Sequence, residues 1–140
     1  MKKRCIDLIV RDKEPLKLST GDTVRTACQS MWERRVGAVL VVDDKDALVG
    51  IFTGRDAVRI LAEAHDGPGT KLAVAMTPDP DTIAPEATSI DALRAMSDGG
   101  YRHLPVVDKG RIVGIVSRGD FKGVEYDRLS DETSLWERIC

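Results

Sequence analysis

The sequence has few of the residues on which several kinds of protein depend. Its three cysteines, Cys5, Cys28 and Cys140, lie far apart and form no Cys-x-x-Cys motif, so neither a zinc site nor a disulfide framework is expected. No apolar run approaches the roughly 20 residues of a membrane-spanning helix. The start of the chain also lacks the long apolar stretch and small-residue cleavage site of a signal peptide. These absences predict a cytoplasmic protein without a membrane segment.

The chain also has no excess of positive charge and few aromatic residues. The net charge is -2 over 140 residues, and aromatic residues make up 4% of the chain. Binding to nucleic acid generally needs clustered lysine and arginine in excess, and single strands are usually held by interleaved aromatic side chains as well. A nucleic-acid partner is therefore not expected. The core must be built from aliphatic residues, within a hydrophobic content of 42% that is ordinary for a globular protein.

What the sequence does contain is an internal repeat. Six residues of the first half recur in the second half at one constant offset. They are Thr23, Ala27, Met31, Val41, Val42 and Asp43, which recur as Thr88, Ala92, Met96, Val106, Val107 and Asp108. One residue is then lost in a turn, after which Val49, Gly50, Ile51 and Asp56 recur as Val113, Gly114, Ile115 and Asp120. A register that changes only at a turn indicates a duplicated unit.

Each copy is predicted to fold as strand, helix, strand, strand and helix (β-α-β-β-α). Apolar residues at a spacing of three and four predict the helices, and short β-branched runs between polar turns predict the strands. In the first copy these elements span residues 16–18, 23–34, 38–42, 48–52 and 57–64. In the second copy the first four span residues 81–83, 88–98, 104–107 and 112–116. Thr88 and Asp91 are expected to form a capping box, and Gly99-Gly100 is expected to end that helix.

This pattern predicts an α/β (α+β) protein made of two copies, residues 5–65 and 72–126, joined by a linker over residues 66–71. Near-continuous apolarity predicts strands that are covered on both faces. A unit of about 60 residues buries too little apolar surface to be stable alone. We therefore expect the copies to pack sheet against sheet about a pseudo-two-fold axis, which leaves two clefts between them.

The tail, residues 127–140, carries its apolar residues at helical spacing. These residues are Leu129, Leu135, Trp136 and Ile139. The spacing predicts a short amphipathic helix that docks either on its own chain or on a neighbouring subunit.

The most informative motif lies where the last strand of each copy meets its final helix. The first copy reads Gly50-Ile51-Phe52-Thr53-Gly54-Arg55-Asp56, and the second reads Gly114-Ile115-Val116-Ser117-Arg118-Gly119-Asp120. A hydroxyl followed three residues later by a carboxylate is a capping box, which is worth about 1 kcal/mol and needs no ligand. The same groups at a helix N-terminus also suit a ribose diol and a phosphate. Both interpretations stay open at this point.

Together these features resemble a tandem pair of cystathionine-β-synthase (CBS) domains, also called a Bateman module. The resemblance rests on the duplicated Thr/Ser-x-x-Asp motif, on Pro105-Val106-Val107-Asp108, and on Ala75-Met76-Thr77-Pro78 before the second copy. It implies a regulatory ligand that contains adenosine: AMP, ADP, ATP, NAD(H) or S-adenosylmethionine. It implies no obligatory cofactor. It also implies a homodimer of tandem pairs and a separate effector protein that reads a ligand-induced change.

The resemblance assigns candidate ligand-binding residues in both copies. Asp56 with Thr53, and Asp120 with Ser117, would hold the ribose hydroxyls, and Ile51 and Ile115 would contact the base. Arg55 and Arg118, inside the two motifs, would supply positive charge for a phosphate. The residues that lead into the first long strand complete the set: Val36, Gly37 and Ala38 in the first copy, and Tyr101, Arg102 and His103 in the second.

The two predicted clefts are not equivalent. Arg102 and His103 stand where the first copy has Gly37 and Ala38. If each cleft combines the motif of one copy with the strand of the other, the Asp56 cleft gains Arg102. His103 either contacts phosphate or serves the strand as a structural residue.

A function of another class remains as the alternative. In it the chain is a ligand-free dimerisation or scaffold module whose motif aspartates only cap helices. Catalysis is not expected, because the sequence has no recognisable paired carboxylates, metal site or nucleophile with an adjacent base.

Overall fold

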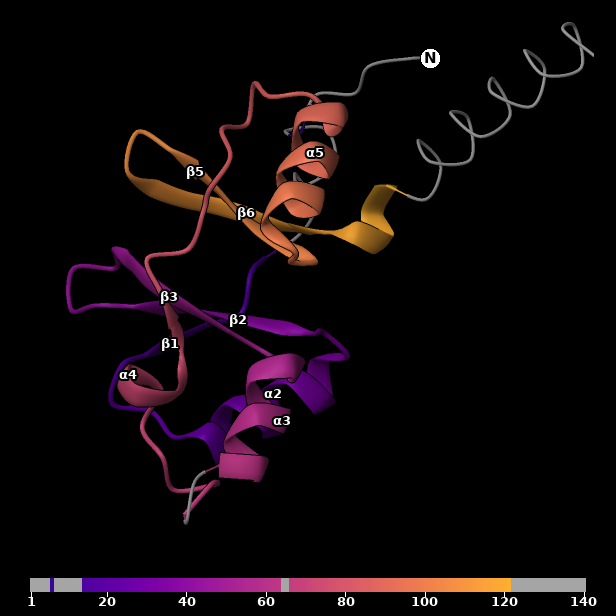
Figure 1. Cartoon of the computed structure of the whole chain (residues 1–140). Helices are drawn as coiled ribbons and strands as arrows, with labels where there is room; N and C mark the ends of the chain where they lie inside the picture. Colours follow the sequence, from indigo (N-terminus) through magenta and orange to yellow (C-terminus); the bar gives the residue numbers. More distant parts are fainter. Residues whose placement is uncertain (1–5, 7–13, 64–65, 122–140) are drawn as a thin grey trace, which may run out of the picture.

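Two sheets lie face to face in the computed structural model of the chain, which describes residues 6, 14–63 and 66–121 (Figure 1). The first sheet has the strand order β1-β2-β3-β4, and the second consists of β5 and β6. In chain order the elements are β1 (Lys17–Ser19), α2 (Val24–Arg34), β2 (Ala38–Val42), β3 (Leu48–Thr53), α3 (Gly54–Glu63), α4 (Leu72–Ala75), β4 (Thr77–Pro78), α5 (Ser89–Gly99), β5 (His103–Asp108), β6 (Arg111–Ser117) and the 3-10 turn η1 (Arg118–Phe121). The order confirms the predicted fold of two packed β-α-β-β-α copies.

Helix boundaries follow the capping residues that the sequence supplies. The side chain of Thr23 accepts a hydrogen bond from the backbone N–H of Thr26 at the start of α2. Thr88 and Asp91 form the predicted capping box at the start of α5. That helix ends at Gly100, whose φ of 71° is in the left-handed region that glycine adopts without strain.

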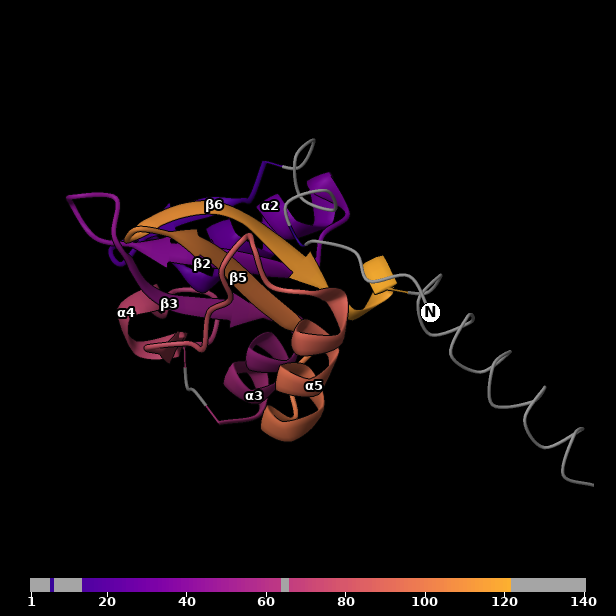
Figure 2. The same ribbon diagram turned by 90° about the horizontal axis from the view of Figure 1, so that it is seen from above.

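The core consists of three clusters of buried residues, one in each copy and one between the two sheets. The strands are apolar on both faces because they contribute to a cluster on each side. Val39 and Val41 of β2 face α2 and α3, whereas Leu40 of the same strand faces the other sheet. The contact between the sheets consists of Ala38, Leu40, Leu48 and Ile51 from the first copy and Ile112 and Ile115 from the second. Figure 2 shows β5 and β6 lying over β2 and β3. Each copy therefore covers a sheet face that would otherwise be exposed.

Three predicted elements differ from the observed ones. Helix α3 begins at Gly54 rather than at residue 57, because its cap is Thr53. The predicted strand over residues 81–83 is reduced to one parallel bridge between Ile83 and Val106. The last helix of the second copy is represented by η1. Residues 127–140, and with them the predicted amphipathic helix, lie outside the described residues.

The two copies exchange a segment, which the sequence did not predict. Leu72 and Ala75 of α4 are fully buried in the core of the first copy, although they lie at the start of the predicted second copy, residues 72–126. Ile6 is buried in the core of the second copy. The exchange is reciprocal: the N–H of Leu72 donates to the carbonyl of Asp22 at 2.8 Å, and that of Ile6 donates to the equivalent Ala87 at 3.0 Å.

Strand β4 continues this exchange along the edge of the first sheet. It pairs antiparallel with β3, where Gly50 lies opposite Pro78 and Ile51 opposite Thr77. A side chain at Gly50 would overlap the thioether of Met76 and come within 3.1 Å of the carbonyl oxygen of Thr77. The glycine three residues before the motif hydroxyl thus lets β4 approach the motif.

The part of the chain that the structure describes contains no helix with the length and apolarity needed to cross a membrane.

Candidate functional site

The first motif forms a closed capping box at the junction of β3 and α3. The backbone N–H and the hydroxyl of Thr53 both donate to Oδ2 of Asp56, at 2.9 and 3.2 Å. In return, the N–H of Asp56 donates to the Thr53 hydroxyl at 3.3 Å. The box fixes one oxygen of the Asp56 carboxylate and leaves the other, Oδ1, for different partners.

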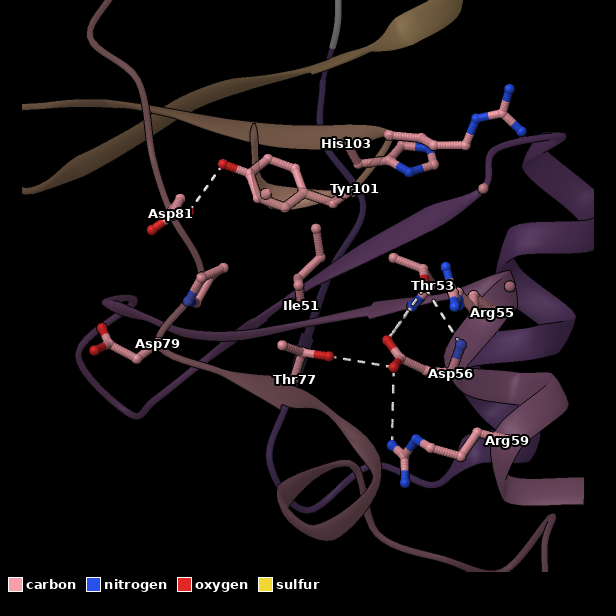
Figure 3. Close-up of a pocket in the computed structure, with 16 residues that line it drawn as sticks. Ile51, Thr53, Arg55, Asp56, Arg59, Thr77, Asp79, Asp81, Tyr101 and His103 are labelled. Atoms are coloured by element: carbon pink, nitrogen blue, oxygen red, sulfur yellow. Dashed lines mark hydrogen bonds and ion pairs between the residues drawn. The ribbon is translucent and has the colours of Figure 1, made fainter. Parts of the chain in front are cut away.

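Two residues from outside the motif, Thr77 and Arg59, approach that second oxygen (Figure 3). The hydroxyl of Thr77, in β4, donates to Oδ1 of Asp56 at 3.2 Å. A guanidinium nitrogen of Arg59 lies 3.8 Å from the same oxygen and donates to the carbonyl of Ala75 at 2.7 Å. The Asp56 side chain is 13% exposed, so these contacts fix its position while a small part of it stays accessible to solvent.

The second motif repeats the box at the end of β6. The N–H and the hydroxyl of Ser117 donate to Oδ2 of Asp120, at 2.7 and 3.3 Å. The strands leading to the two motifs are also held alike. The N–H of Gly54 donates to the carbonyl of Gly37 at 3.2 Å, and that of Arg118 donates to the equivalent Arg102 at 2.9 Å.

A cavity of about 960 Å³ opens beside Asp56. We call it the Asp56 cavity. Its size is within the range of small-molecule sites. Its walls combine the first motif, the segment after β4, and the residues that lead into β5. The lining residues are Gly37, Ile51, Thr53, Gly54, Arg55, Asp56, Arg59, Thr77, Asp79, Pro80, Asp81, Gly99, Gly100, Tyr101, Arg102 and His103.

The structure therefore brings together eight of the fourteen candidate residues. Those lining the cavity are Gly37, Ile51, Thr53, Arg55, Asp56, Tyr101, Arg102 and His103. The motif of one copy meets the strand of the other, so that Asp56 and Arg102 line the same space.

The other six candidates do not line this cavity. Val36 is 42% exposed, whereas Ala38 and Ile115 lie in the contact between the sheets. Ser117, Arg118 and Asp120 belong to the second motif, at the end of β6 and in η1, and are not among the lining residues.

Sequence reasoning missed the lining residues that follow β4. The sequence indicates Thr77 only through the resemblance, and it predicts no role in the site for Asp79 or Asp81. No local sequence signal marks them, because the reciprocal exchange that carries this segment onto the first copy depends on contacts between distant parts of the chain. Arg59 was also missed, although its place one turn after Asp56 puts both on one face of α3.

Opposite charges are balanced in the cavity lining. Three carboxylates face three guanidinium groups, belonging to Asp56, Asp79 and Asp81 and to Arg55, Arg59 and Arg102. The hydroxyl of Tyr101 donates to Oδ2 of Asp81 at 2.9 Å. Burial and this bond to a carboxylate raise the pKa of Tyr101 to about 12, so the phenol keeps its proton at neutral pH.

His103 contacts the strand of the opposite copy. Its imidazole lies where a side chain at Gly37 would come within 3.1 Å of the ring. Burial lowers the pKa of His103, the negative charge of Asp120 raises it, and the positive charge of Arg102 lowers it again. The net direction is downward, so the ring is neutral at pH 7.

We expect the lowered pKa of His103 to make the folded protein less stable in mild acid. Below the ordinary pKa of about 6.5, the unfolded chain takes up a proton that the folded chain takes up only at lower pH. The free energy of unfolding should therefore fall as the pH drops from 7.5 through the folded pKa. His103→Gln should remove this part of the pH dependence. Urea unfolding of both proteins at pH 7.5 and 5.0 measures it, and parallel losses in both would contradict the assignment.

Metal ligation and nucleophilic chemistry find little support among the residues that the structure describes. They contain no group of three or more histidine, cysteine or acidic side chains placed to hold a metal ion. Cys28 packs against the core of the first copy, and burial raises the pKa of its thiol. A raised pKa keeps the thiol protonated and weakly nucleophilic.

Comparison with known proteins matches both copies to one family. A sequence model described as CBS domain matches residues 7–63 and 72–125. The CBS domain-containing protein CBSCBSPB2 of Arabidopsis thaliana is 36% identical over 122 residues, which are 86% of this chain and 22% of that protein. The chain thus spans about a fifth of the length of this relative.

Solved structures share the arrangement of the two copies. The CBS domain protein PAE2072 from Pyrobaculum aerophilum, complexed with AMP, has a TM-score of 0.79 at 22% identity and covers 85% of this chain and 91% of its own. The CBS domain pair of protein MJ0100, in complex with 5'-methylthioadenosine and S-adenosyl-L-methionine, has a TM-score of 0.81 at 23% identity and covers 91% and 99%. At these identities the likeness establishes a common fold.

Proposed function

The chain belongs to the CBS domain family, and from that premise we propose that it is a regulatory module that binds an adenosine-containing ligand in the Asp56 cavity. One observation carries the proposal. The carboxylate of Asp56, at the start of α3, lines the same cavity as Arg102 of the opposite copy. A ligand that contacts both residues would join the two copies. It would therefore favour the arrangement of the copies that it binds best.

The cavity suits the parts of such a ligand. Oδ1 of Asp56, the oxygen not held by Thr53, can accept hydrogen bonds from a ribose diol, as acidic residues do in dinucleotide-binding folds. Arg102 and Arg55 can pair with a phosphate, which the N-terminus of α3 also favours. Ile51, 7% exposed, offers an apolar surface to a base.

The candidate ligands are AMP, ADP, ATP, NAD(H) and S-adenosylmethionine. Two proteins of the same fold were solved with AMP, or with 5'-methylthioadenosine and S-adenosylmethionine. We propose that the ligand is regulatory, that the chain performs no catalysis on it, and that a separate effector protein reads the bound state.

Thermal unfolding in the presence of each candidate ligand tests the proposal. A ligand at 100 times its dissociation constant stabilises the folded state by about 2.7 kcal/mol, which raises the unfolding midpoint measurably. We expect at least one adenosine compound to do so, whereas free ribose and inorganic phosphate should not. If no adenosine compound raised the midpoint, the proposed function would be wrong.

A ligand-free scaffold remains the second candidate, and one observation favours it. All three hydrogen bonds of the Thr53–Asp56 box join groups of the protein, so the motif is sufficient as a helix cap. The two functions differ in what replacing Asp56 does to binding.

We also propose that the module forms a homodimer through the outer faces of α2 and α3. Three large apolar side chains there are exposed: Trp32 by 86%, Leu61 by 74% and Val58 by 66%. Exposed apolar side chains grouped on adjacent elements mark an interaction surface. Trp32→Glu should convert the dimer to monomer in sedimentation equilibrium, whereas Val74→Glu, at an exposed position of α4, should not. A wild-type monomer at high micromolar concentration would contradict the proposal.

A further inference from the structure

Tyr101 and Asp81, both of the second copy, form a hydrogen-bonded link at one side of the Asp56 cavity. Tyr101 leads into β5, and Asp81 belongs to the segment that follows β4. Their hydrogen bond, 2.9 Å long, joins the phenol to one oxygen of the carboxylate. The phenol ring lies against Gly99, because a side chain at Gly99 would overlap it. One side of the ring is thus held by backbone.

This link lies apart from Arg55 and Arg59, two of the three arginines that line the cavity. Figure 3 shows Asp79 and Asp81 on one side, and Arg55 and Arg59 on the other, with Ile51 between them. A ligand that spans the cavity with an anionic group near the arginines must place its opposite end near Asp81. The chemistry of that end is therefore matched to Tyr101 and Asp81.

The pair offers acceptors to a ligand and no donor. An ionised carboxylate only accepts hydrogen bonds, and the single O–H of Tyr101 already donates to Asp81. The remaining oxygen of Asp81 suits an N–H group. A carbonyl oxygen placed there would face the lone pairs of the carboxylate, and both groups would lose their hydrogen bonds to water.

We propose that Tyr101 and Asp81 read the base of the ligand, so that the cavity selects a 6-aminopurine nucleotide over a 6-oxopurine nucleotide. Asp81 accepts a hydrogen bond from the exocyclic amino group, Tyr101 holds Asp81 in place, and the phenol ring provides an aromatic surface for the base. The inference rests on the proposed function of the Asp56 cavity and adds its specificity.

Isothermal titration of the full chain with three nucleotides tests this assignment. The nucleotides are AMP, purine riboside 5'-monophosphate, which lacks only the amino group, and IMP, which carries an oxygen in its place. We expect wild type to bind AMP at least about tenfold more tightly than the other two, as the loss of a hydrogen bond to a charged group predicts.

Asp81→Asn should reduce the ratio of AMP to IMP affinity to near one, because an amide can turn its N–H toward the oxygen. Tyr101→Phe keeps the ring and should reduce that ratio in part.

Asp79→Asn is the matched control. It removes a carboxylate from the same side of the cavity, and asparagine tolerates the left-handed backbone of this residue, whose φ is 48°. The ratio should stay within about twofold of wild type. If wild type bound AMP and IMP equally, or if Asp81→Asn changed the ratio no more than Asp79→Asn, the inference would be overturned while the proposed function survived. If none of the three nucleotides bound, the inference would be overturned, and the proposed function would fail with it only if every other adenosine compound also left the unfolding midpoint unchanged.

Discussion

Replacing Asp56 with alanine is expected to weaken the binding of AMP by about 100-fold, a loss typical of removing one partner from a charged, hydrogen-bonded contact. The reason is geometric. Oδ2 of Asp56 is held by Thr53, and Oδ1 is turned toward Thr77 and the cavity. The alanine variant cannot accept from the ribose hydroxyls in the ligand complex. Titration calorimetry of wild type and Asp56→Ala with AMP gives the ratio of dissociation constants directly.

Asp91→Ala separates this effect from the loss of a helix cap. Asp91 closes the same kind of box with Thr88, at the start of α5, and does not line the Asp56 cavity. Each substitution should lower the free energy of unfolding by about 1 kcal/mol. Only Asp56→Ala should change the affinity for AMP. Equal affinities in the two variants would mean that Asp56 serves as a helix cap alone and does not contact the ligand.

Replacing Arg102 with glutamine is expected to weaken AMP binding by about tenfold, and adenosine binding by less than about threefold, because the lost contact is to the phosphate. The comparison of the two ligands matters, since a general distortion of the cavity would weaken both. Part of the salt dependence of AMP binding should also disappear with the charge, because charges at an exposed site are screened by salt.

Arg94→Gln is the control for the loss of one positive charge. Arg94 is an exposed residue of α5 that does not line the cavity. Its substitution should leave the affinities for AMP and adenosine within about twofold of wild type. If Arg102→Gln weakened adenosine as much as AMP, Arg102 would not contact the phosphate, and the proposed orientation of the ligand would be wrong.

Much of the fold was predictable because its signals are local. The apolar run over residues 38–42 forms β2 with the predicted bounds, because the polar turn after it ends the strand and its residues are buried on both faces. Thr88, Asp91 and Gly100 likewise set the ends of α5 through contacts within a few residues. The Thr53–Asp56 box is also local, and the sequence motif predicted it.

The remaining parts of the site depend on contacts between distant segments, which no local pattern encodes. Thr77 reaches Asp56 because β4 pairs with β3 and α4 is buried in the first copy. Asp81 enters the cavity on the same segment and meets Tyr101, which lies 20 positions further along the chain. The sequence showed each residue but not the exchange that brings them together.

The prediction that the two copies are unequal also has a structural basis. His103 lines the Asp56 cavity and rests against Gly37, so it occupies space next to the strand of the first copy. The equivalent residue of that copy is Ala38, which is buried between the sheets. The stoichiometry of the calorimetric titrations measures whether a second ligand binds beside Asp120.

The most direct test of the account is to map the binding of AMP on the ¹⁵N-labelled chain by NMR. The account predicts that AMP shifts the backbone amide signals of Gly54, Asp56, Thr77 and Arg102, which come from both copies and line one cavity. The signals of Thr88 and Asp91, which form the control capping box, should stay in place. An absence of shifts at saturating AMP, or shifts confined to residues outside the cavity, would contradict the claim that the Asp56 cavity binds an adenosine nucleotide.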